Sequence, residues 1–495
     1  MRNDIYRTRL AKSMDKRVLK FLSSLNEDNW ILEEDIIGTE AHSIMLYEQN
    51  ILSLSEIKKI LKSLNKIKIE MNKKIINKHS NKFEDIHPLI EKLIIDDVGM
   101  DIGGKIHTGR SRNDQVCVDL RLRIRKEIIM LSKILFNLLD ILIPISKSSK
   151  KTYMPLYTHF QKAQLGVFSH YINNYNLQIL RMIERLYEVF QRVNLNPLGA
   201  CAIGATSINI DRERTAELLG FENNIYNSID AISSRDYIYE SLTLLSLCSL
   251  QFSRIAEDLL IWSTKEFDFI NIDEGFCSVS SVMPQKKNPD SLELIRGKCS
   301  KLSSNVMNAA LLLKALPTGY FRDLQELKPI LEDSFSKIKA IIDILAGIFS
   351  TIKINNNKMK SSIKNSYILA LDLAELMVNE LKIPFRKAHN MVGLIVKESN
   401  HLEDLFDIKI INNKIKEHIG SDFILIKESM DYLKDFNLIL KRRDIIGSPS
   451  EKQINITLKM IEKEKNKLLD LFISKQKELE KSTQLRKNLI QKLLS

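Results

Sequence analysis

Apolar residues recur every three to four positions through most of this 495-residue chain, and sustained alternation of apolar and polar residues is rare. The first pattern buries one face of an α-helix, whereas the second would indicate a half-buried strand. The stretch 244–262 is typical, and its apolar side chains share one helical face. They are Leu244, Leu245, Cys248, Phe252, Ile255, Leu259 and Trp262. Because 302–316 and 335–349 repeat the pattern, the sequence predicts a bundle of long helices.

Shorter helical patterns and polar breaks divide the rest of the chain. Residues 50–73 read as two amphipathic helices with a cap region at Ser53–Ser55, and irregular segments interrupt the bundle at 271–290 and 317–329. We expect an N-terminal helical domain, a central long-helix bundle, a small helical domain and a lysine-rich helical extension that packs on the body or a partner. Their ranges are 1–112, 113–365, 366–450 and 451–495.

Composition supports an all-α fold. The chain has only 10 prolines and 16 glycines, the two residues that break helices most strongly. Hydrophobic residues make up 44%, enough for an extensive core and too many for a disordered chain.

The formal charge of +12 has three interpretations: a nucleic-acid surface, a solvated lysine-rich helix surface, or a field that attracts small polyanionic substrates. No nucleic-acid motif accompanies the charge, so we do not expect nucleic-acid binding. The five cysteines form no C-x-x-C pair, which indicates free thiols in a reducing compartment. No apolar run reaches about 18 residues and the N-terminus is polar, so we expect a cytoplasmic protein without a membrane span.

Five polar segments are improbable as core: 23–24, 107–114, 157–164, 278–290 and 320–328. The fourth places a serine pair before two lysines, and its two prolines exclude a regular helix. It is either an ordinary surface loop or a site for removing a proton next to a carboxylate.

Such a carbon acid is very weak, so the dianion that forms must be stabilised by positive charge and by hydrogen-bond donors. A serine can act as the base if lysines and backbone amides favour its ionised form. A histidine can then protonate the leaving nitrogen. His159 is the candidate, although a lone histidine is more often structural. Arg110, Arg112 and Asn113 could recognise carboxylates or form a surface salt-bridge loop.

Several motifs together resemble the fumarase/aspartase superfamily and, within it, the argininosuccinate lyase family and its delta-crystallin relatives. They are EDIH at 84–87, HTGRSRNDQ at 107–115, YTHFQKAQ at 157–164, SSRD at 233–236, SSVMPQKKNPDSLELIRGK at 280–298 and DLQELK at 323–328. The resemblance implies a three-domain helical fold with a twenty-helix core in a homotetramer, and active sites shared by three subunits. It also implies reversible cleavage of argininosuccinate to arginine and fumarate without a metal or organic cofactor.

Carried over residue by residue, the resemblance makes Ser280 the catalytic serine and His159 the catalytic histidine. Glu293 would orient the histidine and Lys286 would bind the fumarate-side carboxylate. Which of Ser280 and His159 acts as base and which as acid stays open. The implied substrate-binding residues are Ser24, Asn113, Thr158, Asn288, Tyr320, Gln325 and Lys328, with Arg112 and His87 as additions.

The chain departs from the family pattern at Leu165, where proline is usual, at Phe160, where a smaller apolar residue is usual, and at Val279, where glycine is common. None of these changes removes a catalytic side chain. The alternatives are another fumarate-releasing lyase such as an adenylosuccinate lyase, a non-catalytic protein of crystallin type, and a nucleic-acid-binding protein that uses the tail. Gln285 and the motif at 107–114 disfavour the first, and intact Ser280, His159 and Lys286 disfavour the second.

Overall fold

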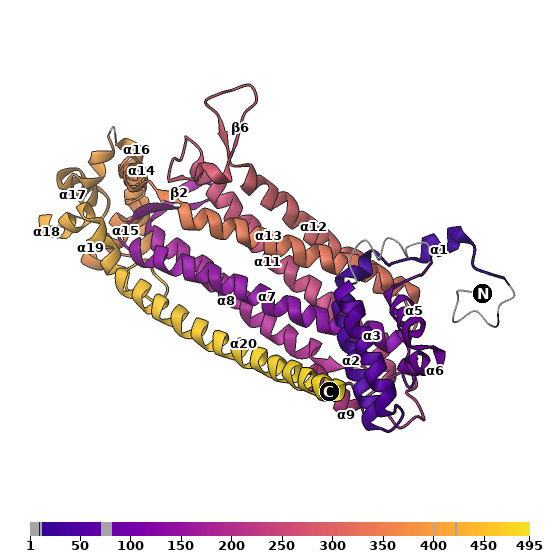
Figure 1. Ribbon diagram of the computed structural model, residues 1–495. Helices are drawn as coiled ribbons and strands as arrows, with labels where there is room; N and C mark the ends of the chain where they lie inside the picture. The colour runs from indigo at the N-terminus through magenta and orange to yellow at the C-terminus, as the bar shows by residue number, and fades with distance from the viewer. Residues whose placement is uncertain (1–8, 10–11, 71–81, 400, 421–422) are drawn as a thin grey trace.

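The computed structural model describes residues 9, 12–70, 82–399, 401–420 and 423–495. Long helices lie side by side and form the body of the molecule (Figure 1). All seven apolar residues of the stripe at 244–262 are buried in α11, which confirms the helical face read from the sequence. The helices of the body are α7 (Arg112–Ser148), α8 (Phe168–Val193), α11 (Asp236–Ser263), α12 (Asp290–Leu313) and α13 (Leu327–Thr351).

Helix α7 is the longest of these, and its start is fixed by a capping box. Ser111 Oγ accepts a hydrogen bond from the Asn113 amide, and Asp114 accepts one from the Ser111 amide at 2.9 Å. Of the described helices, α7 is the one long and apolar enough to cross a membrane. Half of that apolar window is buried inside the molecule, as in the core helix of a bundle.

Short helices gather at one end of the body, beside the start of α7 (Figure 1). The expectation of two helices within 50–73 is wrong, because one uninterrupted helix runs from Leu54 to Glu70; residues 71–73 lie outside the described part. The expected cap region is present, since the Glu56 carboxylate accepts from the Ser53 amide at 2.8 Å. The elements at this end are α1 (Lys16–Leu22), η1 (Glu27–Trp30), α2 (Leu32–Glu48), α3 (Leu54–Glu70), α5 (Ile86–Val98), α6 (Met100–Gly103), η2 (Gly104–His107), α9 (Arg212–Leu219) and α10 (Ser228–Ser233).

A second group of short helices lies at the opposite end of the body (Figure 1). Together with the bundle it confirms the all-α fold class. The expected domain boundaries remain predictions, although α7 begins at Arg112, next to the first of them. The helices of this group are α14 (Asn356–Lys364), α15 (Ala370–Leu381), α16 (Phe385–Glu398), η5 (Leu402–Phe406), α17 (Ile408–His418), α18 (Lys427–Asp431), η6 (Tyr432–Lys434) and α19 (Phe436–Arg442); η3 (Glu274–Phe276) and η4 (Arg322–Glu326) lie within the two irregular segments.

Strands occur as two-stranded pairs between the helices. The largest is an antiparallel hairpin of β1 and β2 with a bulge between Leu156 and Tyr157, a feature that the helical pattern did not predict. A second antiparallel pair, β6 with β7, frames the loop that contains Ser280. The strands are β1 (Tyr153–Thr158), β2 (Gln161–Val167), β3 (Leu195–Asn196), β4 (Asn223–Asn224), β5 (Ile270–Asn271), β6 (Ser278–Val279), β7 (Lys287–Asn288) and β8 (Lys353–Ile354).

The C-terminal extension is one helix, α20 (Glu451–Leu494), that follows the body from one end to the other (Figure 1). It packs on α8, α7, α9 and α3 of the same chain. The Phe472 ring lies edge-on to the rings of Phe136 and Tyr187, with centroids 6.2 and 5.6 Å away. Near its end, Arg486 pairs with the buried carboxylate of Glu40 at 3.1 Å. The extension therefore completes the core of the molecule.

Replacing Phe472 with Ala should lower the free energy of unfolding by about 3–5 kcal/mol, because a large buried aromatic side chain leaves a cavity between helices. Phe472 is 5% exposed, whereas its neighbour Ile473 is 40% exposed and offers a matched control. Urea denaturation of both alanine variants is the measurement. Equal stability of the two variants would mean that α20 does not contribute to the core.

Candidate active site

A buried lysine joins the first turn of α13 to the N-terminal segment. Lys328, in the first turn of α13, forms an ion pair with Asp28 of η1 and donates to Ser24 Oγ at 3.2 Å. Ser24 Oγ in turn donates to Asp28 Oδ2 at 3.0 Å. Burial raises the pKa of the Asp28 carboxyl, and the ammonium of Lys328 opposes that rise. The predicted binding residues Ser24 and Lys328 are thus in direct contact, around an aspartate that the sequence argument did not include.

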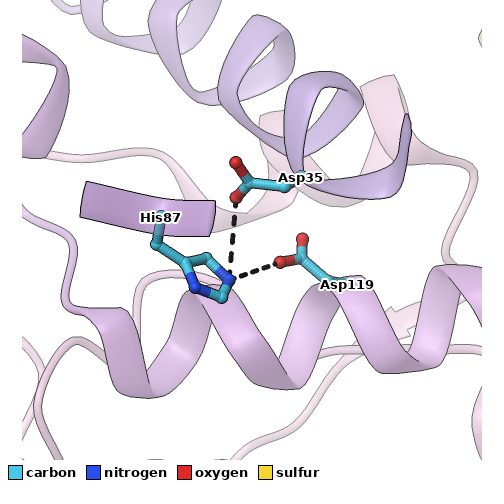
Figure 2. A group of neighbouring side chains, drawn as sticks. All are labelled: Asp35, His87 and Asp119. Atoms are coloured by element: carbon cyan, nitrogen blue, oxygen red, sulfur yellow. Dashed lines mark hydrogen bonds and ion pairs between the residues drawn. The ribbon is translucent and has the colours of Figure 1, made fainter. Parts of the chain in front are cut away.

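A second buried cluster is centred on His87, and Figure 2 shows its ring between Asp35 of α2 and Asp119 of α7. The distances are 3.0 Å from Nε2 to Asp119, 3.9 Å from Nε2 to Asp35, and 3.0 Å from Nδ1 to Asp85. Burial by itself lowers the pKa of His87, but hydrogen bonds to Asp119 and Asp85 and the charge of Asp35 raise it to about 10. This geometry suits a doubly protonated ring whose two nitrogens donate to Asp85 and Asp119, while burial and the charge of Asp35 raise the pKa of the Asp119 carboxyl.

The same three side chains could in principle hold a metal ion, since the ligand atoms of Asp35, His87 and Asp119 lie within 4.8 Å of one another. A protonated imidazole supplies the positive charge that these carboxylates need, and His87 Nε2 already lies at hydrogen-bond distance from Asp119. We interpret the cluster as an ion-paired histidine. It ties α2, α5 and α7 together.

Replacing His87 with Gln should lower the free energy of unfolding at pH 7 by about 3–5 kcal/mol, because buried carboxylates lose their counter-charge. The folded-state pKa of about 10 lies above that of an unfolded histidine. The stabilisation is therefore complete below about pH 6.5 and disappears as the pH rises through 10. Denaturation curves between these values should show the gap to wild type closing. Exposed His389→Gln is the control, and a gap independent of pH would contradict an ion-paired His87.

A surface-facing arginine continues this network. Arg112, at the start of α7, lies 3.1 Å from Asp85 and 3.3 Å from Glu84. Glu84 also pairs with Arg322 at 2.7 Å, and Arg322 and Gln325 both donate to the carbonyl of Leu22, two residues before Ser24. Hydrogen bonds and ion pairs therefore link the predicted residues Arg112, Gln325 and His87 through the motif at 84–87.

Two further predicted residues lie at the same end. Asn113 Nδ2 donates to the carbonyl of Ala202 at 2.8 Å. The loop that contains Ala202 is held in place by Asp114, whose Oδ2 accepts hydrogen bonds from the amides of Gly199 and Cys201 at 2.9 Å each. Tyr320 is half-buried; burial raises its pKa, and nearby Arg235 opposes the rise. We define the amino-end cluster as Ser24, Asp28, Asp85, His87, Arg112, Asn113, Tyr320, Gln325 and Lys328.

His159 occupies a two-residue turn at the tip of the β1–β2 hairpin, where Thr158 pairs with Gln161. His159 and Phe160 both have positive φ, 52° and 57°, as the turn between such closely paired strands requires. Histidine enters that region more readily than most residues, whereas a bulky phenylalanine seldom does, so the unfavourable position of the turn is Phe160. Thr158 and His159 are exposed. The departure at Leu165 falls in β2, where Leu165 is buried opposite Pro155.

Ser280 begins the loop that connects β6 to β7, which projects from the body (Figure 1). Its Oγ accepts hydrogen bonds from the amides of Met283 at 3.0 Å and Val282 at 3.3 Å. Lys286, at the other end of the loop, is exposed, and its carbonyl accepts from the Ser280 amide. The departure at Val279 leaves this pairing intact, since Val279 pairs with Lys287 across the strands.

Asn288 and Glu293 follow the same loop. Asn288 pairs with Ser278 in the strand register and is half-buried. Glu293 is exposed in the first turn of α12.

The structure brings the predicted residues together in three separate sets. The amino-end cluster lies at one end of the body, and the hairpin tip and the Ser280 loop lie toward the other (Figure 1). Among the described residues, no hydrogen bond or ion pair joins one set to another. Sequence reasoning missed Asp28, Asp85 and the other partners of the binding residues. Asp28 lies four positions after Ser24, and Asp85 lies within the motif at 84–87. This closeness in the sequence was the signal that could have identified them.

Comparison with known proteins identifies the family to which the chain belongs. Residues 8–303 match a lyase family model, and residues 367–426 match the model of the argininosuccinate lyase C-terminal region. The argininosuccinate lyase of Nitrosopumilus maritimus is 42% identical over 447 residues, 90% of each chain. That of Methanocaldococcus jannaschii is 40% identical, covering 92% of this chain and 93% of its own. The chain belongs to the argininosuccinate lyase family.

Solved structures agree on the fold of this argininosuccinate lyase family member. An EDDS lyase in complex with formate superposes with a TM-score of 0.85 at 24% identity, covering 94% of this chain and 92% of its own. The class II fumarase of Schistosoma mansoni reaches 0.70 at 12% identity, covering 86% and 94%. These structures confirm the expected fold, and the sequence comparisons confirm the expected family and lyase class.

Proposed function

We propose that this chain catalyses the reversible β-elimination of argininosuccinate to L-arginine and fumarate, the last step of arginine biosynthesis. The observation that carries the mechanism is the environment of Ser280. Two backbone amides point at its Oγ, and Lys286 lies in the same loop. Both features stabilise a developing alkoxide, which is what a serine base requires.

In the proposed reaction, Ser280 removes a proton from the succinate carbon next to the carbon that carries nitrogen. The electron pair first resides on the adjacent carboxylate, where Lys286 and Asn288 stabilise the added negative charge. That pair then forms the double bond of fumarate as the carbon–nitrogen bond breaks. His159, oriented by Glu293, donates a proton to the departing nitrogen of arginine.

We assign substrate recognition to the amino-end cluster together with Thr158. Ser24, Asn113, Tyr320, Gln325 and Lys328 present hydroxyl, amide and ammonium groups, and Arg112 adds a guanidinium. Both ring nitrogens of His87 contact carboxyl groups, so we assign this residue a structural role that fixes the positions of Asp85 and Asp119.

We further propose a homotetramer in which each active site takes one of the three sets from each of three subunits. The separation of the sets within one chain supports this. So do large apolar side chains that are 44–65% exposed on α11 and α12, which a subunit interface would cover. They are Leu247, Leu250, Leu294, Met307 and Leu311. Light scattering should give about four times the subunit mass of 57.2 kDa.

The proposed site uses no metal and no organic cofactor, because its own side chains supply base, acid and positive charge. We place the reaction in the cytoplasm. All five cysteines are free thiols, which fits a reducing compartment.

The direct test is the ultraviolet absorbance of fumarate during incubation of purified tetramer with argininosuccinate. Adenylosuccinate is the comparison substrate and should release none. Absence of fumarate from argininosuccinate would refute the proposed activity. Release of fumarate from adenylosuccinate alone would indicate an adenylosuccinate lyase instead.

A further inference from the structure

A cavity of about 600 Å³ lies away from Ser280, His159 and the amino-end cluster, where the start of β1 meets α14 and the small C-terminal helices. Tyr153 lines it from the first position of β1, and Leu433 and Phe436 line it from η6 and α19. The rings of Tyr153 and Phe436 meet edge to face, with centroids 5.5 Å apart. Ile363 and Leu433 are each 1% exposed and complete an apolar floor. A flat apolar group of ligand size fits this chemistry.

Positive charge surrounds the floor. Lys360 and Lys364 lie one turn apart on α14, and Lys434 reaches the cavity from η6. Asp435 is the acidic residue of the lining, and its carboxylate already accepts the Asn437 amide at 2.8 Å. Lys434 pairs with Asp431 at 3.1 Å, whereas no ion pair is formed by Lys360 or Lys364 with any described residue. Two lysines at this spacing repel each other unless an anion lies between them.

We propose that this cavity binds a small organic anion with an aromatic ring, of the chemical class of a nucleoside phosphate. The ring lies on the floor beside Tyr153 and Phe436, and the phosphate groups meet Lys360 and Lys364. The cavity volume of about 600 Å³ falls within the 300–1,000 Å³ range typical of small-molecule sites. The site is separate from the catalytic residues, and its binding test does not rest on the proposed function.

An occupant would also contact the support of the catalytic histidine. Tyr153 begins the strand that ends at Thr158, next to His159. The return strand is tied to α14, because Lys162 Nζ donates to the carbonyl of Ser362 at 2.7 Å. A ligand bound between α14 and β1 would therefore contact both elements that position the hairpin with His159. We expect binding to change the turnover number more than the KM.

Isothermal titration of the full-length protein with ATP, AMP, adenosine and inorganic tripolyphosphate tests the proposal. ATP should bind, and the double variant Lys360→Ala/Lys364→Ala should weaken it by about tenfold or more through lost charge-assisted contacts. The matched control is Lys463→Ala/Lys467→Ala, two exposed lysines with the same spacing on α20. Saturating fumarate, which should occupy the catalytic site, should leave ATP binding unchanged.

Three results would overturn the proposal. The first is that neither ATP nor AMP binds, and the second is that both double variants lose binding equally. The third is that tripolyphosphate binds as tightly as ATP, which would show that the aromatic ring contributes nothing to binding. A single charge reversal, Lys364→Glu, guards against misfolding of the double variant and should also abolish binding. Retained binding in a folded Lys364→Glu protein would count against this cavity.

Discussion

Replacing Ser280 with Ala should cut turnover of argininosuccinate by about three orders of magnitude or more, while the substrate still binds. The variant loses the oxygen that two backbone amides hold in place, and no other hydroxyl in the loop has that pair of donors. The contacts assigned to recognition lie elsewhere and stay intact. Initial rates of fumarate formation measure the first effect, and titration of the inactive variant with argininosuccinate measures the second.

The neighbouring residue provides a matched control. Ser281 is exposed, and Ser281→Ala changes the same loop by the same single atom. This variant should keep turnover within a fewfold of wild type. Near-normal turnover by Ser280→Ala would remove the serine from the mechanism and leave His159 as the base.

Two inactive variants should restore each other when they share a tetramer. Subunits carrying His159→Ala and subunits carrying Ser280→Ala, co-expressed with different affinity tags and purified through both, should recover activity. If each site takes its hairpin and its loop from different subunits, random mixing leaves about a quarter of the sites with both residues intact. Recovery to about that fraction of wild-type activity, from parents that have almost none, is the expected result.

Pairing two variants of one loop provides the control for that experiment. Ser280 and Lys286 lie within the same loop between β6 and β7, so every site receives both from one subunit. Mixed tetramers of Ser280→Ala and Lys286→Ala should therefore stay inactive. Recovery in this pair, or none in the first, would refute the shared sites.

The sequence predicted those features that depend on local patterning. The stripe from Leu244 to Trp262 predicted α11 because a helix repeats its buried face every 3.6 residues. Pro284 and Pro289 predicted an irregular loop because proline lacks an amide donor, and the structure has a non-helical loop at these positions. These effects act within a few residues, so a single sequence contains them.

The features that were missed depend on partners distant in the sequence. The β1–β2 hairpin turns at His159 and Phe160, which have none of the glycine or asparagine that marks such turns, so its turn signal is absent. The ion pair of Lys328 with Asp28 joins residues 300 positions apart. Likewise, the three carboxylates around His87 come from three separate segments. Only the folded chain brings such groups together.

The placement of α20 has a consequence for how the protein is made. The groove that Phe472 fills is built from helices synthesised far earlier, and Arg486 meets Glu40 across 446 positions of the chain. A nascent polypeptide folds from its N-terminus while it is still on the ribosome, so this groove stays open until translation is almost finished. Its apolar lining is therefore available to chaperones throughout elongation, and we expect a chain that ends near residue 450 to expose this lining permanently and to aggregate.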